Sequence, residues 1–139
     1  MDPIKLAAGV YWIGDLCYVL DSRWDEFCAL TIEGHNVKEG AFTMADGTQF
    51  IFFGTAYGDG LYYDQEGNEY PVDAGLIGCV LADKVDSDAR LELGKVHTFE
   101  NDVWSDSDGQ VLNFGHIQID TDPVFEEEYE DDWDEEEDN

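Results

Sequence analysis

Positive charge is the feature that this 139-residue chain has least of. Six Lys and Arg residues stand against 34 Asp and Glu residues, which gives a formal net charge of −28. Proteins that hold nucleic acid neutralise its phosphates with Lys and Arg, so this imbalance predicts no direct binding to DNA or RNA. The same charge repels anionic membrane surfaces and attracts basic protein surfaces. The charge balance therefore points to a basic protein as the partner.

Long apolar runs are missing as well. The runs at residues 49–53 and 76–81 fall far short of the ~18 residues that a membrane-spanning helix needs. The N-terminus lacks the basic region and the apolar core of a signal peptide. These absences predict a soluble protein without membrane contact that resides in the cytoplasm, which would be the host cytoplasm if the chain is phage-encoded.

Cysteine is scarce too, and Cys17, Cys28 and Cys79 show neither a C-x-x-C motif nor a His at zinc-ligand spacing. We expect buried free thiols and no structural zinc. The sequence has no P-loop, no G-x-G-x-x-G and no G-x-S-x-G, and none of its three His residues lies in a recognised nucleophile context. These absences predict a protein that is not an enzyme and carries no cofactor.

Apolar residues, by contrast, are plentiful enough for a packed core. They make up 43% of the chain, with 4 Trp, 7 Tyr and 8 Phe, and a chain of this length forms one domain. We assign residues 1–121 to an acidic α+β domain and residues 122–139 to an acidic, aromatic tail. The aromatic residues expected in the core are Tyr11, Trp12, Trp24, Phe27, Phe50, Phe52, Phe53, Trp104 and Phe114.

The first third of the chain predicts one strand and one helix. Residues 9–14 are rich in β-forming residues between two glycines, which is typical of a strand. Residues 22–33 have apolar side chains at helical spacing. Ser22 provides a weak capping signal at the start of this helix, and Gly34 provides a stop after it.

Beyond the helix, the turn signals become typical of β structure. Asp-Gly and other Gly-containing turns separate short runs of β-forming residues. These runs predict strands at 41–45, 48–55, 61–64, 69–73, 76–84, 95–100, 102–105 and 110–119. The expected fold is α+β, mainly antiparallel β in a curved sheet or open barrel, with the one helix packed on one face.

The tail combines charge with aromatic residues, because residues 122–139 hold 12 acids and no base. Pro123 and the four-residue spacing of three aromatic residues suit a helix, whereas adjacent like charges oppose one. The acids would lie about 5 Å apart in an extended chain and about 2.3 Å apart in a helix. Only the helical spacing approaches the ~1.7 Å of duplex DNA. The predicted partner-binding residues are Phe125, Glu126, Glu127, Glu128, Tyr129, Glu130, Asp131, Asp132, Trp133, Asp134, Glu135 and Glu136.

A weaker candidate site lies in the glycine-rich loops between residues 54 and 75. Asp59, Asp64 and Asp73 could meet there and hold a hard cation such as calcium through oxygen ligands. The same residues also fit two hairpin turns, in which Asp side chains accept local hydrogen bonds. We favour the turns and predict no metal site.

Four segments within residues 10–80 carry a family resemblance. They are 11–19 (YWIGDLCYV), 24–28 (WDEFC), 53–60 (FGTAYGDG) and 70–78 (YPVDAGLIG). Together they resemble a group of small acidic phage and bacterial proteins of uncharacterised function, which implies no catalytic residue. Leu16 departs from the proline expected after Gly-Asp. In size and charge the whole chain is also similar to phage-encoded DNA-mimic inhibitors of restriction enzymes and other nucleic-acid-binding defence proteins.

The leading hypothesis is an inhibitor that occupies the basic nucleic-acid-binding surface of a host protein, in the manner of an anti-restriction or anti-CRISPR protein. Two alternatives stay open. An immunity or antitoxin-like protein that neutralises a basic toxin would have the same charge. A cation-binding or enzymatic β-domain with a solubilising tail would use Asp59, Asp64 and Asp73.

Overall fold

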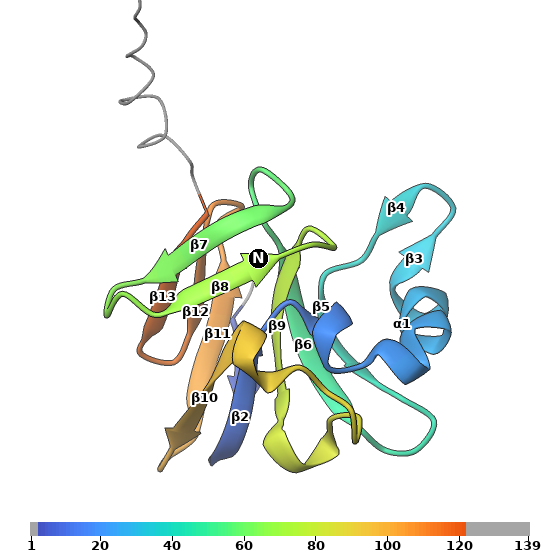
Figure 1. The fold of residues 1–139 in the computed structure, drawn as a ribbon, viewed down its shortest axis with the longest axis horizontal. Coiled ribbons are helices and arrows are strands. Elements are labelled where there is room, and N and C mark those ends of the chain that lie inside the picture. Colours follow the sequence, from blue (N-terminus) through green and yellow to red (C-terminus); the bar gives the residue numbers. More distant parts are fainter. Residues whose placement is uncertain (1–2, 122–139) are drawn as a thin grey trace, which may run out of the picture.

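Residues 3–121, which the computed structural model describes, form three layers (Figure 1). A six-stranded sheet packs against one face of a five-stranded sheet, and helix α1 (Trp24–Thr31) covers the other face together with the turns around it. Every strand pair is antiparallel. The predicted α+β class with one helix in the N-terminal half is therefore confirmed, and the sheets do not close into a barrel. No helix in the described range is long and apolar enough to cross a membrane.

The strands of the two main sheets come from all parts of the described chain. The six-stranded sheet contains, in spatial order, β1 (Ile4–Leu6), β11 (Val103–Ser107), β12 (Val111–Phe114), β13 (Ile117–Asp120), β7 (Gly60–Asp64) and β8 (Glu69–Val72). The five-stranded sheet contains, in spatial order, β10 (Gly94–Phe99), β2 (Gly9–Gly14), β9 (Leu76–Leu81), β6 (Gln49–Gly54) and β5 (Gly40–Thr43).

Shorter elements connect these strands. A separate two-stranded hairpin, β3 (Ile32–Glu33) and β4 (Asn36–Val37), follows the helix directly. Four 3₁₀ turns complete the described fold: η1 (Leu16–Tyr18), η2 (Asp21–Arg23), η3 (Ala82–Lys84) and η4 (Leu91–Leu93).

The five-stranded sheet is buried on both faces because its central strands are apolar at successive positions. In β6, Ile51 and Phe53 pack in the core between the two sheets, whereas Phe50 and Phe52 pack under α1. This double burial explains why the sequence shows continuous apolar runs in these strands instead of alternation with polar residues.

A row of glycines makes room for the largest core side chain. Gly94, Gly14 and Gly78 lie opposite one another on β10, β2 and β9. Trp12 is fully buried with its ring against Gly14 and Gly94, and its indole Nε1 donates to the Leu91 carbonyl at 3.0 Å. A Cβ atom at Gly94 would collide with the Trp12 ring. The sheet therefore needs glycine where the indole crosses it.

The predicted helix is present but shorter than expected, and its predicted capping residues are wrong. Residues 21–23 form η2, and α1 begins only at Trp24. Ser22 does not cap the helix with its side chain; its backbone N–H donates to Asp86 Oδ2 at 2.7 Å. Gly34, with φ of +65°, forms the turn of the β3–β4 hairpin. Because the chain passes straight from α1 into extended Ile32, no glycine is needed to end the helix.

Two of the predicted strands have wrong bounds. The single strand expected at 110–119 is two strands, β12 and β13, because Gly115 adopts φ of +63° and reverses the chain. The strand expected at 76–84 ends at Leu81, where η3 begins. The other predicted strands match observed ones to within two residues at each end. Strands β1, β3 and β4, of two or three residues each, were not predicted.

Seven of the nine aromatic residues predicted for the core are buried. Trp24 is half-buried. Trp104 is 59% exposed, so its assignment to the core is wrong. The inward-facing residue of β11 at this point is Ser105, which is fully buried and donates its hydroxyl to the Ile4 carbonyl at 3.1 Å. Because the inward position holds a polar residue, the sequence does not indicate which side chains of this strand face the core.

The glycine row generates a stability prediction. Gly78→Ala places a Cβ against the Ile51 carbonyl and within 2.8 Å of Phe52 Cβ, so we expect it to lower the free energy of unfolding by about 1–3 kcal/mol through overpacking. Gly9→Ala is the matched control, because its Cβ would meet only side-chain atoms, Leu81 Cδ2 at 3.3 Å and Tyr11 Cε2 at 3.4 Å, and no backbone. Urea unfolding measures both. Equal effects of the two substitutions would contradict the packing described for Gly78.

Candidate binding surface

In the described residues, most acidic side chains are exposed to solvent and most basic side chains form ion pairs. Residues 3–121 contain 21 Asp and Glu and all six Lys and Arg of the chain, and 16 of these acids are exposed. Four of the six bases, Lys5, Arg23, Lys38 and Arg90, form ion pairs with acids of the same domain. The positive charge is thus largely neutralised in place, and the remaining surface charge is negative.

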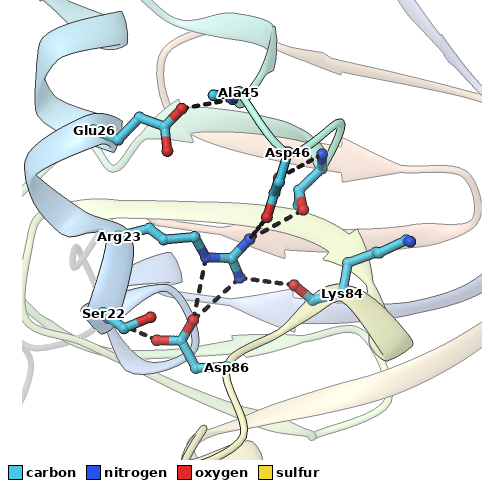
Figure 2. A network of polar contacts seen from close by, with 8 residues as sticks. Ser22, Arg23, Glu26, Ala45, Asp46, Lys84 and Asp86 are labelled. Atoms are coloured by element: carbon cyan, nitrogen blue, oxygen red, sulfur yellow. Dashed lines mark hydrogen bonds and ion pairs between the residues drawn. The ribbon is translucent and has the colours of Figure 1, made fainter.

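Arg23 is the base that lies deepest, and its guanidinium is held by groups from two segments, residues 46–48 and 84–86 (Figure 2). Its Nε and Nη2 donate to Asp86 Oδ1 at 3.3 and 3.1 Å. Its Nη1 donates to Asp46 Oδ2 at 2.9 Å and to the Thr48 hydroxyl at 3.0 Å, and its Nη2 also donates to the Lys84 carbonyl at 2.8 Å. This network ties the start of α1 to the β5–β6 turn and to the loop after β9.

Asp86 is the acid at the centre of the network. Burial raises the pKa of its carboxyl, but hydrogen bonds from Ser22 and Arg23 outweigh this effect and hold the pKa below its usual range. The backbone N–H of Asp86 donates to the Val19 carbonyl at 2.9 Å, and that of Arg90 donates to the Tyr18 carbonyl at 3.0 Å. These hydrogen bonds therefore hold the loop 82–93 against the segment 16–23.

Exposed carboxylates surround two hollows at this junction. Asp21, Asp73 and Asp88 line a hollow of about 320 Å³. Asp46 and Asp83 line another of about 330 Å³ beside Asp86. We call the five exposed acids of these hollows, Asp21, Asp46, Asp73, Asp83 and Asp88, the acidic loop region. Arg90 and Arg23 also line these hollows. Arg90 pairs with Glu92, and Arg23 pairs with Asp46 and Asp86.

A buried carboxylate positions one side of the acidic loop region. Asp15 is fully buried and accepts a hydrogen bond from the Cys17 backbone N–H at 3.0 Å. Its other oxygen accepts from the backbone N–H groups of Asp73 and Ala74 at 2.7 and 2.6 Å. The adjacent Gly75 carbonyl accepts from the Thr55 N–H at 3.0 Å. Segments 11–19, 53–60 and 70–78 therefore meet around Asp15.

The cysteine thiols are free, as predicted, but only Cys79 is buried. Burial raises the pKa of the Cys79 thiol far above its usual range. Burial, aided by the nearby Asp15 carboxylate, does the same to the pKa of Cys17. Because the thiolate is the reactive form of cysteine, neither residue is activated as a nucleophile.

A chain of polar side chains also connects the two sheets. Tyr70 is fully buried, and its hydroxyl donates to Asp64 Oδ2 at 2.8 Å and lies 2.9 Å from His97 Nε2. Asp64 further accepts from the backbone N–H groups of Glu66 and Asn68 at 2.8 and 3.0 Å. Burial raises the pKa of Asp64, but the hydrogen bonds from Asn68 and Tyr70 outweigh it and lower the pKa overall.

The three weak metal candidates occupy separate turns. Asp64 ends β7 and is engaged by its own hairpin, Asp73 lies in the β8–β9 turn against Asp15, and Asp59 is exposed in the β6–β7 loop. In residues 3–121, no group of three or more His, Cys, Asp or Glu side chains is placed to hold a metal ion. The hydrogen bonds of Asp64 are those of a turn-stabilising residue.

The predicted partner-binding residues 125–136 lie outside the described residues. The acidic loop region, in contrast, is not among the binding residues predicted from the sequence. Its five acids come from four separate segments, and no local spacing links them. The signal that could have indicated part of it is the high density of Asp between residues 83 and 88.

Comparisons with known proteins add no relative. No family model matches the chain, and no curated protein or solved structure matches it.

The Arg23 network predicts unequal effects for two Arg substitutions. Arg23→Ala leaves the Asp86 side chain, only 4% exposed, without its cation, and we expect a loss of about 3 kcal/mol in the free energy of unfolding. Arg90→Ala removes a pair with side chains 62% and 66% exposed, so we expect less than about 1 kcal/mol. Thermal or urea unfolding measures both. Comparable small losses would show that the network does not hold these loops.

His97 predicts a pH dependence of stability. Burial, opposed by the nearby Asp64 charge, lowers the pKa of this ring below its ordinary value of ~6.5. The unfolded chain then binds the proton more readily, so the free energy of unfolding should fall as the pH drops below about 6.5. His97→Gln removes this contribution, while the relief of self-repulsion on acidification remains in both proteins. A difference between the two proteins that stays constant from pH 8 to pH 5 would contradict the prediction.

Proposed function

We propose that this protein binds the basic nucleic-acid-binding surface of another protein and blocks that surface competitively. The observation that carries the proposal is the charge distribution, with 16 exposed acids in the described residues and four of six bases already paired. A surface of this kind attracts a basic groove and repels the nucleic acid that would otherwise occupy it. The protein would then act by binding, without catalysis.

The acidic loop region is suited to such binding because its backbone is fixed before a partner arrives. Asp15 holds the turn of Asp73, and the Arg23 network holds Asp46 and the loop before Asp88. Charges on ordered loops lose less conformational freedom on association than charges on loose segments. Complementary charge also accelerates encounter with the partner. The region can therefore contribute to both the rate and the affinity of binding.

The alternative of a cation-binding or enzymatic domain has less support. Asp64 is saturated by hydrogen bonds in its own hairpin, and the thiols of Cys17 and Cys79 stay protonated. The immunity or antitoxin alternative shares the electrostatic argument and differs in the identity of the basic partner. A toxin gene next to the coding sequence would favour immunity, and a location among early phage genes would favour an anti-defence role.

The test is affinity capture on the immobilised full chain from host lysate. We expect a basic nucleic-acid-binding protein to be retained at 0.1 M salt and released near 1 M, because the Debye length falls from ~10 to ~3 Å. Excess duplex DNA should release the same protein. The triple variant Asp21→Asn, Asp83→Asn, Asp88→Asn should retain at least tenfold less of it.

A matched variant controls for the change in net charge. Asp59→Asn, Glu69→Gln and Glu100→Gln remove three exposed acids elsewhere on the domain and should reduce retention much less. Retention that is unaffected by salt, or a captured protein that keeps its DNA bound on the same surface, would contradict the proposal.

A further inference from the structure

An apolar groove lies between α1, the β3–β4 hairpin and the ends of β6 and β9. Its volume is about 420 Å³, near the lower end of the ~300–1,000 Å³ typical of ligand pockets. Its accessible apolar surface comes from Trp24 on α1 and from Ile32 and Val37 on the hairpin, and the buried rings of Phe27 and Phe52 lie beneath. Trp24 stacks on Phe27 at 4.3 Å between ring centroids, so this part of the groove is built from packed aromatic rings.

The hairpin exposes apolar side chains beside this groove. Ile32 and Val37 are cross-strand partners, yet they are 45% and 58% exposed. The hairpin stands next to α1 and joins neither large sheet (Figure 1). Two strands alone gain little stability from their own pairing. The exposed pair lies directly beside the groove and extends its apolar surface.

The rim of the groove is acidic. Glu39 lines it directly and accepts from the Gly54 backbone N–H at 3.0 Å. Glu33 lies on the hairpin next to Ile32, and Asp73 precedes the lining residues Ala74 and Gly75. The nearby cation Lys38 pairs with Glu33 at 2.7 Å, so these two charges cancel, and Glu39 and Asp73 give the rim its negative charge. An occupant that combines an apolar side chain with positive charge therefore complements the groove.

We infer that the groove receives an apolar side chain of the basic partner, presented on a segment in which Lys or Arg residues flank it. This inference rests on the proposed function and gives the electrostatic contact an apolar anchor. Large apolar side chains in desolvated pockets commonly dominate binding energy, while surrounding charges set orientation and encounter rate. The acidic loop region alone would bind any basic surface, whereas the groove selects among basic surfaces.

Charge argues against the two occupants that this chain itself could supply. Residues 122–139 hold 12 acids and no base, so their approach to an acidic rim is opposed by repulsion. A second copy carries the same formal charge of −28 and meets the same repulsion. A basic segment of a partner is the occupant whose charge complements the rim.

A defined peptide tests the inference on the full chain. The probe is a synthetic peptide in which two Leu residues are flanked on both sides by Lys, and its control carries Ser in place of Leu. We expect the Leu peptide to bind at least tenfold more tightly by calorimetry and to shift the methyl NMR signals of Ile32 and Val37. The groove variant Ile32→Ser, Val37→Ser should lose this advantage without a change in melting temperature.

Val10→Ser with Val96→Ser is the matched control, since these valines are 44% and 43% exposed on other strands, and it should bind like the unaltered protein. Equal affinity for the Leu and Ser peptides would overturn the groove inference and leave the proposed function standing. If the protein binds neither the Leu peptide nor the Ser peptide, both the groove inference and the proposed function are overturned.

The same measurements identify the rival occupants. In the absence of peptide, a shift of the Ile32 and Val37 methyl signals caused by Phe125→Ala with Trp133→Ala would show that the chain's own tail fills the groove. Self-association in sedimentation experiments that is lost in the groove variant would show that a second copy fills it. Either result would overturn the inference.

Discussion

Burial of the five-stranded sheet on both faces is the constraint on which the rest of the structure depends. A domain with 21 acids and six bases in its described part repels itself, and surface ion pairs offset little of that repulsion. Apolar burial must therefore supply the stability. Strands β2, β6 and β9 contribute apolar side chains to two cores at once, and Gly14 and Gly94 leave room for the Trp12 ring.

Because the cores carry the stability, the covering layer is free to serve recognition. Its few internal charges have fixed partners: Asp15 accepts three backbone N–H groups, and Asp86 pairs with Arg23. These contacts hold loops that are distant in sequence and leave the remaining carboxylates facing solvent. The acidic loop region and the apolar groove lie on this same layer, and it is the layer that we propose binds a basic partner with an apolar anchor.

The sequence predicted the class of fold well, since Gly-containing turns mark the ends of most strands and the runs between them are rich in β-forming residues. It failed where the outcome depended on distant contacts. Gly115 was read as part of a strand because the runs on both sides favour β structure, and Trp104 was assigned to the core although Ser105 takes the inward position. The acidic loop region could not be predicted for the same reason, because its position depends on contacts between residues far apart in the chain, such as the hydrogen bonds that the Asp15 carboxylate accepts from the turn of Asp73 and that Arg23 donates to Asp46.

The most direct test of the account is a competition measurement with the purified captured protein. Fluorescence anisotropy of a labelled DNA duplex reports how much DNA that protein holds while this chain is titrated in. The account predicts complete displacement, with a midpoint that rises in proportion to the affinity and concentration of the DNA and is highly sensitive to salt. A ternary complex, in which anisotropy stays high or increases while this chain is bound, would contradict it.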